Sequence, residues 1–527
     1  MVIRRGTLKQ TVTYDGFGRL ESVSKTDSAS PAQNASVSID YNAMGQRTFI
    51  SYPNTPAVGV SMSYDTLDRI KTVRHLGSSR TYTYNATTTS ITNERGITHT
   101  IGFRAYGDPD QRELMSISVP APDAAASVSL SRNDIGRITS VTQGGVTRLF
   151  GYNGTIAPGN YLYSITDPEV GMTSFGRDQN GNMTSRSVNG SPATGFIYDN
   201  MDRLLQTNYP AGTPSVTRTY YGDGLLQTAN TTAVQRFFQY DANKNLTLER
   251  VVVDGRTYDI TNSYSGNDGL NAVTYPSGAA VTYTANGFGR PTQAAPFASG
   301  VGFHPSGQLT SITHGNGLVT NIGLNGRLWP NSVTTTGNAV NIGYAYDGLG
   351  NVTSYSDAIN PNNNITSLTY DSVDRLTGAS IGGEVRTFDY SGSGNVTTQT
   401  RAGQTLTYNY NATNNRLESI ANAPKPYNFT YDVYGNVTNN GTSAFQYNHA
   451  SQMTCANCGT AKQTDFLTDG LDMRVRMQKG AVVTYFIHAR NGQLMVEDTP
   501  LTANGGAEIK GNAEQFKCCE NLAVIAD

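Results

Sequence analysis

A degenerate motif recurs about every 20 residues along this chain, and it constrains the fold more than any other feature. Its fullest copies begin at Tyr14, Tyr346 and Tyr431 and follow the pattern Tyr-Asp-x-x-Gly-Arg/Asn-Leu/Val. Relatives that read Tyr-Asp followed by Asp-Arg begin at Tyr64, Tyr198 and Tyr370. A unit this short cannot bury a core of its own. The chain is therefore an array of small units, and its function must belong to what the array builds.

Each unit reads as a β-hairpin. Residues 281–293 alternate apolar and polar side chains on both sides of an Asn-Gly-Phe-Gly cluster, which is the pattern of two strands around a tight turn. The motif glycines supply the positive φ that such a turn needs; they include Gly18, Gly289, Gly350 and Gly435. We place Tyr198, Tyr221, Tyr240, Tyr264, Tyr283 and Phe303 at the first motif position of successive units. The sequence predicts an all-β chain with almost no helix.

Composition favours a thin sheet over a thick globular core. Only 15% of the residues are charged and 37% are hydrophobic, while 55 are Gly and 31 are Tyr. This composition is too aromatic for disorder and too polar for one large core. We expect one sheet face to carry Tyr and aliphatic side chains and the other to carry Thr, Asn and Ser.

Charge and hydropathy exclude two classes of partner. The net charge is −2 and Lys and Arg form no run, so nothing indicates nucleic-acid binding. No stretch approaches the roughly 18 apolar residues of a membrane-spanning helix. The N-terminus lacks the apolar segment of a Sec signal peptide. We expect a protein that is secreted or displayed on the cell surface without a visible Sec signal, or a piece of a longer protein.

The repeated motif resembles that of the RHS/YD-repeat family, which includes bacterial Rhs polymorphic-toxin shells, Tc-toxin shells and the YD shell of teneurins. The motif copies extend over residues 1–498, and we assign that range to one repeat array. The resemblance implies a long antiparallel sheet that spirals into a hollow shell. In the bacterial relatives such a shell holds an unfolded toxic domain. We expect Tyr, Thr and Asn on a polar inner face, because such a face would hold a partly unfolded guest chain without gripping it.

The resemblance has limits. The bacterial shells end in an Asp-Pro-x-Gly-Leu signature for self-cleavage, and this chain has none. Its Asp108-Pro109 and Asp167-Pro168 lie mid-chain, where we interpret them as turn starts. Residues 499–527 diverge from the motif, and we assign them to a C-terminal segment that leads toward a missing core region.

Few residues suggest chemistry, and we predict neither an enzyme nor a cofactor. The weak metal candidates are Cys455, Cys458, Cys518 and Cys519; a local disulfide, with Cys455 in a turn between strands, is an equal alternative. Asp68, Asp202 and Asp374 precede arginines in separate units, so turn capping explains them better than a glycosidase pair does. We assign structural roles to the motif residues Tyr14, Gly18, Tyr64, Tyr198, Tyr283, Gly289, Tyr346, Gly350, Tyr370, Tyr431 and Gly435.

The leading hypothesis is a non-catalytic shell, or shell fragment, of an Rhs-type protein that encloses a toxin or other polypeptide cargo, in contact with neighbouring shell parts. The alternative is an extracellular or cell-surface protein that binds carbohydrate or a partner cell, because some of the many Tyr rings must be exposed. A further alternative is self-association into a tube or fibre, because an unfinished spiral leaves strand edges that can pair.

Overall fold

The computed structural model describes residues 1–28, 33–105, 112–153 and 161–500. Within these ranges the chain is built from strands, with three single 3-10 turns and no α-helix, which confirms the predicted all-β fold. The 3-10 turns are η1 (Ala124–Ala126), η2 (Thr336–Asn338) and η3 (Pro361–Asn363). No helix among the described residues has the length and apolar character needed to cross a membrane.

The first half of the array contains β1 (Val2–Arg5), β2 (Leu8–Tyr14), β3 (Leu20–Asp27), β4 (Gln33–Tyr41), β5 (Arg47–Tyr52), β6 (Thr55–Tyr64), β7 (Ile70–His75), β8 (Ser78–Tyr84), β9 (Thr88–Thr92), β10 (Thr98–Ala105), β11 (Arg112–Ser118), β12 (Val128–Arg132), β13 (Ile138–Gln143), β14 (Val146–Asn153), β15 (Tyr161–Asp167), β16 (Gly171–Arg177), β17 (Met183–Val188), β18 (Thr194–Tyr198), β19 (Leu204–Asn208), β20 (Val216–Tyr220), β21 (Leu226–Asn230), β22 (Val234–Tyr240), β23 (Leu246–Val253) and β24 (Arg256–Tyr264).

The second half contains β25 (Leu270–Thr274), β26 (Ala280–Ala285), β27 (Pro291–Ala295), β28 (Ala298–Phe303), β29 (Leu309–His314), β30 (Val319–Leu324), β31 (Pro330–Thr335), β32 (Val340–Tyr346), β33 (Val352–Asp357), β34 (Ile365–Tyr370), β35 (Leu376–Ile381), β36 (Glu384–Tyr390), β37 (Val396–Arg401), β38 (Gln404–Tyr410), β39 (Leu417–Ala421), β40 (Tyr427–Asn428), β41 (Thr430–Tyr431), β42 (Val437–Asn439), β43 (Phe445–Tyr447), β44 (Met453–Ala456), β45 (Thr464–Thr468), β46 (Arg474–Lys479), β47 (Val482–His488) and β48 (Leu494–Asp498).

The strands form one long antiparallel ribbon in chain order. Strands β1–β40 belong to a single 40-stranded sheet, followed by the pair β41–β42 and a six-stranded sheet β43–β48. Neighbours in sequence pair antiparallel, as β2 does with β3 and β47 with β48. Such a ribbon has two edges. We call the turns that carry the repeated motif the motif turns, and those that join one hairpin to the next the linking turns.

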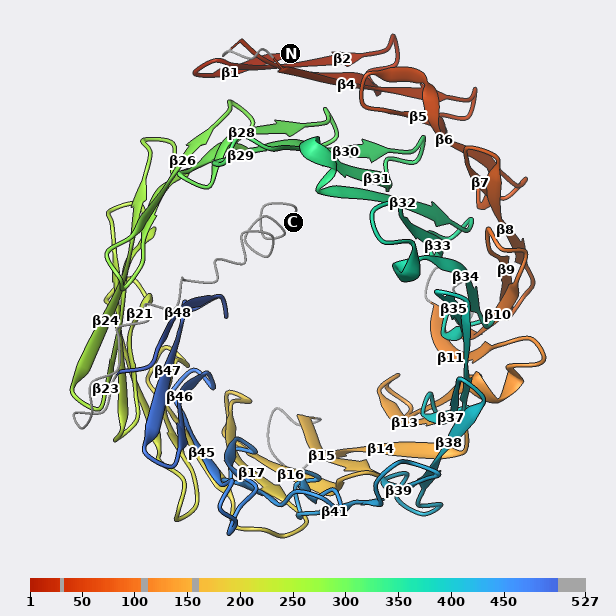
Figure 1. Cartoon of the computed structure of the whole chain (residues 1–527). Coiled ribbons are helices and arrows are strands. Elements are labelled where there is room, and N and C mark those ends of the chain that lie inside the picture. Colours follow the sequence, from red (N-terminus) through yellow and green to blue (C-terminus); the bar gives the residue numbers. More distant parts are fainter. Residues whose placement is uncertain (29–32, 106–111, 154–160, 501–527) are drawn as a thin grey trace.

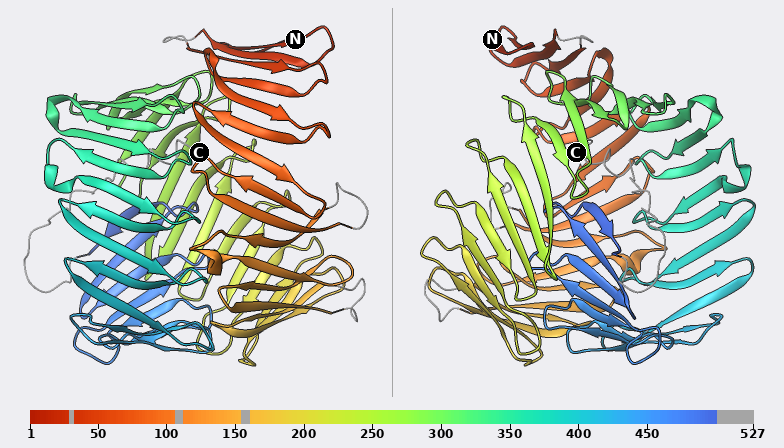
Figure 2. Two further views of the ribbon diagram at one scale, coloured as in Figure 1. Left: turned by 90° about the vertical axis from the view of Figure 1, so that its right-hand side faces the viewer. Right: turned by 60° about the vertical axis from the view of Figure 1, so that its left-hand side comes forward.

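The ribbon coils around a central space (Figure 1), as expected for a long twisted sheet. Asn189 bonds Val433, which lies 244 residues later, and His449 bonds Thr213, 236 residues earlier. These separations correspond to one winding, so the described chain completes about two. We call β1–β24 the first winding and β25–β48 the second. Figure 2 shows them side by side along the coil axis.

A β-bulge marks the first motif position in unit after unit. The register shifts at Tyr14 and at Tyr346, where the strand enters its motif turn. The same shift identifies Tyr220 and Ala285 as first motif positions. Our assignment of Tyr221 and Tyr283 to that position was therefore wrong: the former follows the bulge by one residue and the latter precedes it by two.

The largest core lies where the last strands pass inside the wall. Val475, Ile487 and Met495 of β46–β48 pack against Val234 and Val251 of β22–β23, and Figure 1 shows these late strands nearer the centre. Elsewhere the wall is a single sheet, and most of its side chains are only partly buried. The molecule is thus single-walled with one double-layered region.

The packing at β22 also shows which face points inward. Val234, Arg236 and Phe238 contact the late strands, and alternation puts Tyr240 on the same side. Thr219, next to Tyr220, faces the other way and bonds the hydroxyl of Thr228. In this wall the face with Tyr and aliphatic side chains is the inner one, and the Thr-rich face is the outer one. Of the residues that we expected on the inner face, Tyr lies there at β22, whereas Thr219 lies on the outer face.

Candidate functional site: the motif turns and the seam between windings

The motif Asp holds its turn closed. Asp15 Oδ1 accepts hydrogen bonds from the backbone N–H groups of Phe17 and Arg19, each at 2.9 Å, and Oδ2 accepts from Arg19 Nε at 2.7 Å. In the next such unit, hydrogen bonding from the Arg69 guanidinium lowers the pKa of Asp65. The Asp-to-Arg spacing of the motif therefore reflects one closed ring of contacts.

The motif Arg and Tyr connect one unit to the next. The Arg375 guanidinium lies 4.7 Å from the ring centroid of Tyr390, whose hydroxyl donates to the carbonyl of Leu376 at 2.8 Å. This bond explains why Tyr recurs where Phe would pack equally well. The same hydroxyl-to-carbonyl bond is made by Tyr41, Tyr64, Tyr84, Tyr152, Tyr198, Tyr220, Tyr240, Tyr264, Tyr346, Tyr370 and Tyr431.

The residue before the motif Arg or Asn has a positive φ. Gly18, Gly289, Gly350 and Gly435 have φ values of 78°, 78°, 102° and 87°. Asp68, Asp202 and Asp374 take the same position, with φ values of 62°, 59° and 64°. Each of these Asp side chains accepts a hydrogen bond from a neighbouring motif turn, as Asp202 does from Asn182 at 2.6 Å. They are spaced along the ribbon, which gives no carboxylate pair for glycoside hydrolysis.

A seam joins the windings, with linking turns of the first winding meeting motif turns of the second. Glu169 accepts a bond from Asn415 at 2.6 Å, and Asp123 accepts one from the hydroxyl of Ser372 at 2.6 Å. Arg95 bonds Asp374 at 2.6 Å. Most seam contacts are polar and involve backbone atoms, so they fix the axial register of the windings.

One part of the seam is a buried cluster of charges. Arg236 Nε lies 2.5 Å from Asp469 Oδ2, and neither side chain is exposed. The same guanidinium donates to the carbonyl of His488 at 3.0 Å and lies 3.9 Å from Glu249. Burial raises the pKa of Glu249, whose carboxylate accepts the backbone N–H of Arg490 at 2.7 Å.

A cleft of about 530 Å³ adjoins this cluster. It lies between the wall at β23–β27 and the turn that precedes β48. Tyr264, Tyr275 and Tyr283 line it together with Arg490 and Met495. Aromatic rings beside polar groups are a composition that suits a small polar-aromatic ligand.

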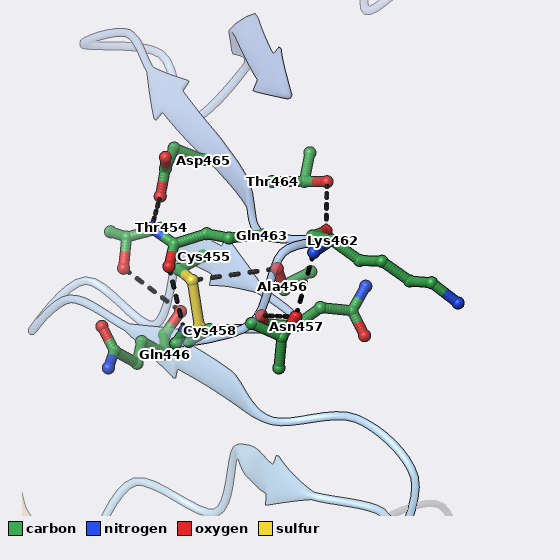
Figure 3. Close-up of a disulfide and its surroundings, with 12 residues drawn as sticks. Gln446, Thr454, Cys455, Ala456, Asn457, Cys458, Lys462, Gln463, Thr464 and Asp465 are labelled. Carbon is green, nitrogen blue, oxygen red and sulfur yellow. Dashed lines mark hydrogen bonds between the residues drawn. A yellow bond between two sulfur atoms is a disulfide. The ribbon is translucent and has the colours of Figure 1, made fainter. Parts of the chain in front are cut away.

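Two of the four cysteines form a disulfide, Cys455–Cys458 (Figure 3). Cys455 is buried within strand β44, so our placement of it in a turn was wrong; Cys458 is the residue in the turn. Cys518 and Cys519 lie outside the described residues. Among the described residues, no group of three or more His, Cys, Asp or Glu side chains is arranged to hold a metal ion.

The structure describes one of the two Asp-Pro steps, Asp167-Pro168. Asp167 ends strand β15 and lies 3.2 Å from Arg148, in an ordinary ion pair before a turn. Asp108-Pro109 lies outside the described residues.

The seam cluster was not predicted from the sequence. In most Tyr-Asp units with a motif Arg, the Asp pairs with the Arg four residues later, as Asp371 does with Arg375. Four residues after Asp469 the chain has Met473, so this Asp takes its Arg from the other winding. That departure from the motif was visible in the sequence and marks the position as unusual.

Known proteins share the coiled antiparallel sheet described above. Residues 331–494 match the family model described as the teneurin YD-shell. The chain has the fold of a YD-repeat shell. The solved structure of TcdB2-TccC3 without its hypervariable C-terminal region superposes with a TM-score of 0.71 at 14% identity over 91% of this chain. A Photorhabdus luminescens Tc holotoxin pore gives a TM-score of 0.62 at 13% identity, also over 91% of this chain.

The chain spans only 30% of the length of either solved chain. No curated protein matches its sequence. The resemblance to RHS/YD-repeat shells and the spiralling antiparallel sheet that it implied are thereby confirmed.

Proposed function

We propose that this shell is a non-catalytic container that encloses a polypeptide cargo, such as a toxin, for delivery from the cell. The observation that carries the proposal is the coil itself: the ribbon winds about twice around a space that no described strand crosses (Figure 1). Strand β48 ends on the inner side of the wall (Figure 1), so a polypeptide attached beyond it starts within the coil. Similarity to a Tc holotoxin component supports export as part of a larger assembly.

The test uses protease protection. An unfolded reporter peptide is fused to the C-terminus of the chain and digested with a nonspecific protease. We expect protection in the intact shell and rapid digestion in the variant Arg236→Ala/Asp469→Ala, whose buried seam cluster is removed. The same reporter fused to the N-terminus, which precedes the outer strand β1, serves as the control. Equal digestion at both termini of the intact shell would contradict enclosure.

Electron microscopy of the purified chain should show hollow particles.

The cleft beside the seam favours one further candidate, carbohydrate binding at an extracellular or cell-surface location. Tyr264, Tyr275 and Tyr283 line the cleft together with the amide side chains of Asn262 and Gln493. Sugars stack on aromatic rings and bond to amides. Saturable binding of an oligosaccharide that Tyr283→Ala abolishes would support this function, and an absence of binding across a glycan array would exclude it.

A further inference from the structure

One rim of the shell carries a row of exposed apolar side chains. They all lie in motif turns of the first winding, at the third residue counted from the motif Asp or Asn. Their exposed fractions are large for apolar residues: Phe17 86%, Met44 75%, Leu67 68%, Met201 69% and Ile135 59%. Phe17, Met44 and Leu67 occupy three consecutive motif turns. Exposed apolar side chains normally occur singly, so a group of them marks an interaction surface.

The turns themselves do not require this exposure. In four of these turns, those of Phe17, Met44, Leu67 and Met201, the third residue donates its backbone N–H to the motif Asp or Asn, as Leu67 does to Asp65 at 2.9 Å. That bond fixes the backbone and leaves the side chain pointing away from the ribbon edge. A polar residue would serve the turn equally well, as Asn243 does after Asp241.

The second winding shows what covers this position. Its apolar residues at the same place in the motif turn are only partly exposed; they are Phe288, Leu349, Val373, Tyr434 and Leu471. Leu471 packs beside the core of Ala229 and Phe238, and the backbone around Leu349 approaches Glu94 of the first winding. In the second winding, the linking turns of the first winding provide the cover.

The opposite rim of the molecule presents linking turns of the second winding. Val385 follows the turn at Gly382 and Gly383, and Val482 follows the turn at Gly480. Both valines are exposed, at 63% and 55%. Each molecule therefore presents motif turns on one rim and linking turns on the other, which are the two kinds of turn that meet in the seam. Both rims carry exposed apolar side chains.

We propose that the motif-turn rim of one molecule docks on the linking-turn rim of a second copy, which repeats the seam between molecules. The contact is heterologous, because two different surfaces meet. Repeating it adds copies along the coil axis and extends the wall into a tube. This assembly goes beyond cargo enclosure, and it stands whether or not the shell holds a guest.

The test compares three proteins by analytical ultracentrifugation over a range of concentrations. Wild type should form stacks. The variant Phe17→Ser/Met44→Ser/Leu67→Ser should weaken the apparent association constant by more than about tenfold, because three apolar side chains leave the contact. The control is Leu149→Ser/Tyr163→Ser/Met172→Ser, which removes three half-exposed apolar side chains from strands away from the rim. The control should associate like wild type.

A second measurement identifies the surface that is met. A benzoylphenylalanine in place of Met44 should crosslink, on illumination, to peptides of another molecule that contain Val385 or Val482. Thermal melting confirms that each variant is folded. The proposal is overturned if folded wild type stays monomeric at the highest concentration, if the control dissociates as the rim variant does, or if the crosslinks join one motif-turn rim to another.

Discussion

Arg236 and Asp469 form a fully buried ion pair across the two windings, with 2.5 Å between Nε and Oδ2. They lie 233 residues apart in the sequence. Asp469 also accepts the backbone N–H groups of Leu471 and Met473, so its carboxylate closes its own turn and binds the other winding. One side chain thus couples the local repeat to the closure of the coil.

The first prediction concerns this pair. Arg236→Met keeps an unbranched apolar stem but leaves Asp469 buried without its partner guanidinium, which should cost about 3–5 kcal/mol. Arg250→Met is the matched control, because its partner Asp259 is partly exposed and such pairs contribute less than about 1 kcal/mol. Hydrogen exchange of the amides in β22 and in residues 469–473 measures both effects, since repeat arrays can open locally. Equal losses in the two variants would argue against the special role of the buried pair.

The second prediction concerns pH. Burial raises the pKa of Glu249 above the ordinary value of 4.5, so its ionisation opposes folding. Stability is lost as the pH rises from 4.5 toward the folded-state pKa. Glu249→Gln removes this loss and still accepts the N–H of Arg490. We expect the melting temperature of the variant to exceed that of wild type at neutral pH, with the difference disappearing below pH 4.5.

A carboxylate with the opposite shift provides the control for pH. At Glu384, burial acts to raise the pKa, but hydrogen bonds from Arg386 and Arg401 outweigh it and lower the pKa. Its ionised form is therefore favoured by folding, and its contribution is lost as the pH falls below 4.5. Glu384→Gln should lower the melting temperature at neutral pH and match wild type in acid. The same sign for both variants would refute the argument from burial.

The third prediction tests the reason for the recurring Tyr. Tyr390→Phe removes the hydroxyl that donates to Leu376 and leaves that carbonyl without this donor, which should cost about 0.5–1.5 kcal/mol. Tyr14→Phe, at the half-exposed first unit, should cost much less. Denaturant unfolding followed by circular dichroism compares the two. If neither substitution changes stability, the hydroxyl bond is not the reason why Tyr recurs.

The fourth prediction tests the motif glycine. Gly350 has φ of 102°, and a Cβ there would lie 3.2 Å from the Trp329 ring, so Gly350→Ala should cost about 1–2 kcal/mol. The matched control is Gly16→Ala, which has an ordinary φ and open space around the new methyl group. Gly16→Ala should be neutral or slightly stabilising in the same unfolding assay. A neutral Gly350→Ala would show that the turn can relax.

The sequence determined the unit and its repetition. The alternation around each Gly-containing cluster predicted the hairpins, and the Tyr-Asp and Arg spacing reflects contacts that close within five residues, as between Asp15 and Arg19. Such short-range contacts need no knowledge of the rest of the chain. Where the motif is degenerate, the predicted first motif position was misplaced. Only the β-bulge showed that Ala285, and not Tyr283, holds that position.

Tertiary structure alone decided how the ribbon closes. The curvature of the coil accumulates from small twists at every strand, and no single residue encodes it. That curvature places Arg236 beside Asp469 and leaves Phe17 uncovered while Phe288, at the same motif position, is partly buried. It also placed the face with Tyr and aliphatic side chains inward at β22 and the Thr-rich face outward. Local pattern sets which face of the sheet is apolar, but only the sense of coiling decides whether that face lines the lumen or the outside.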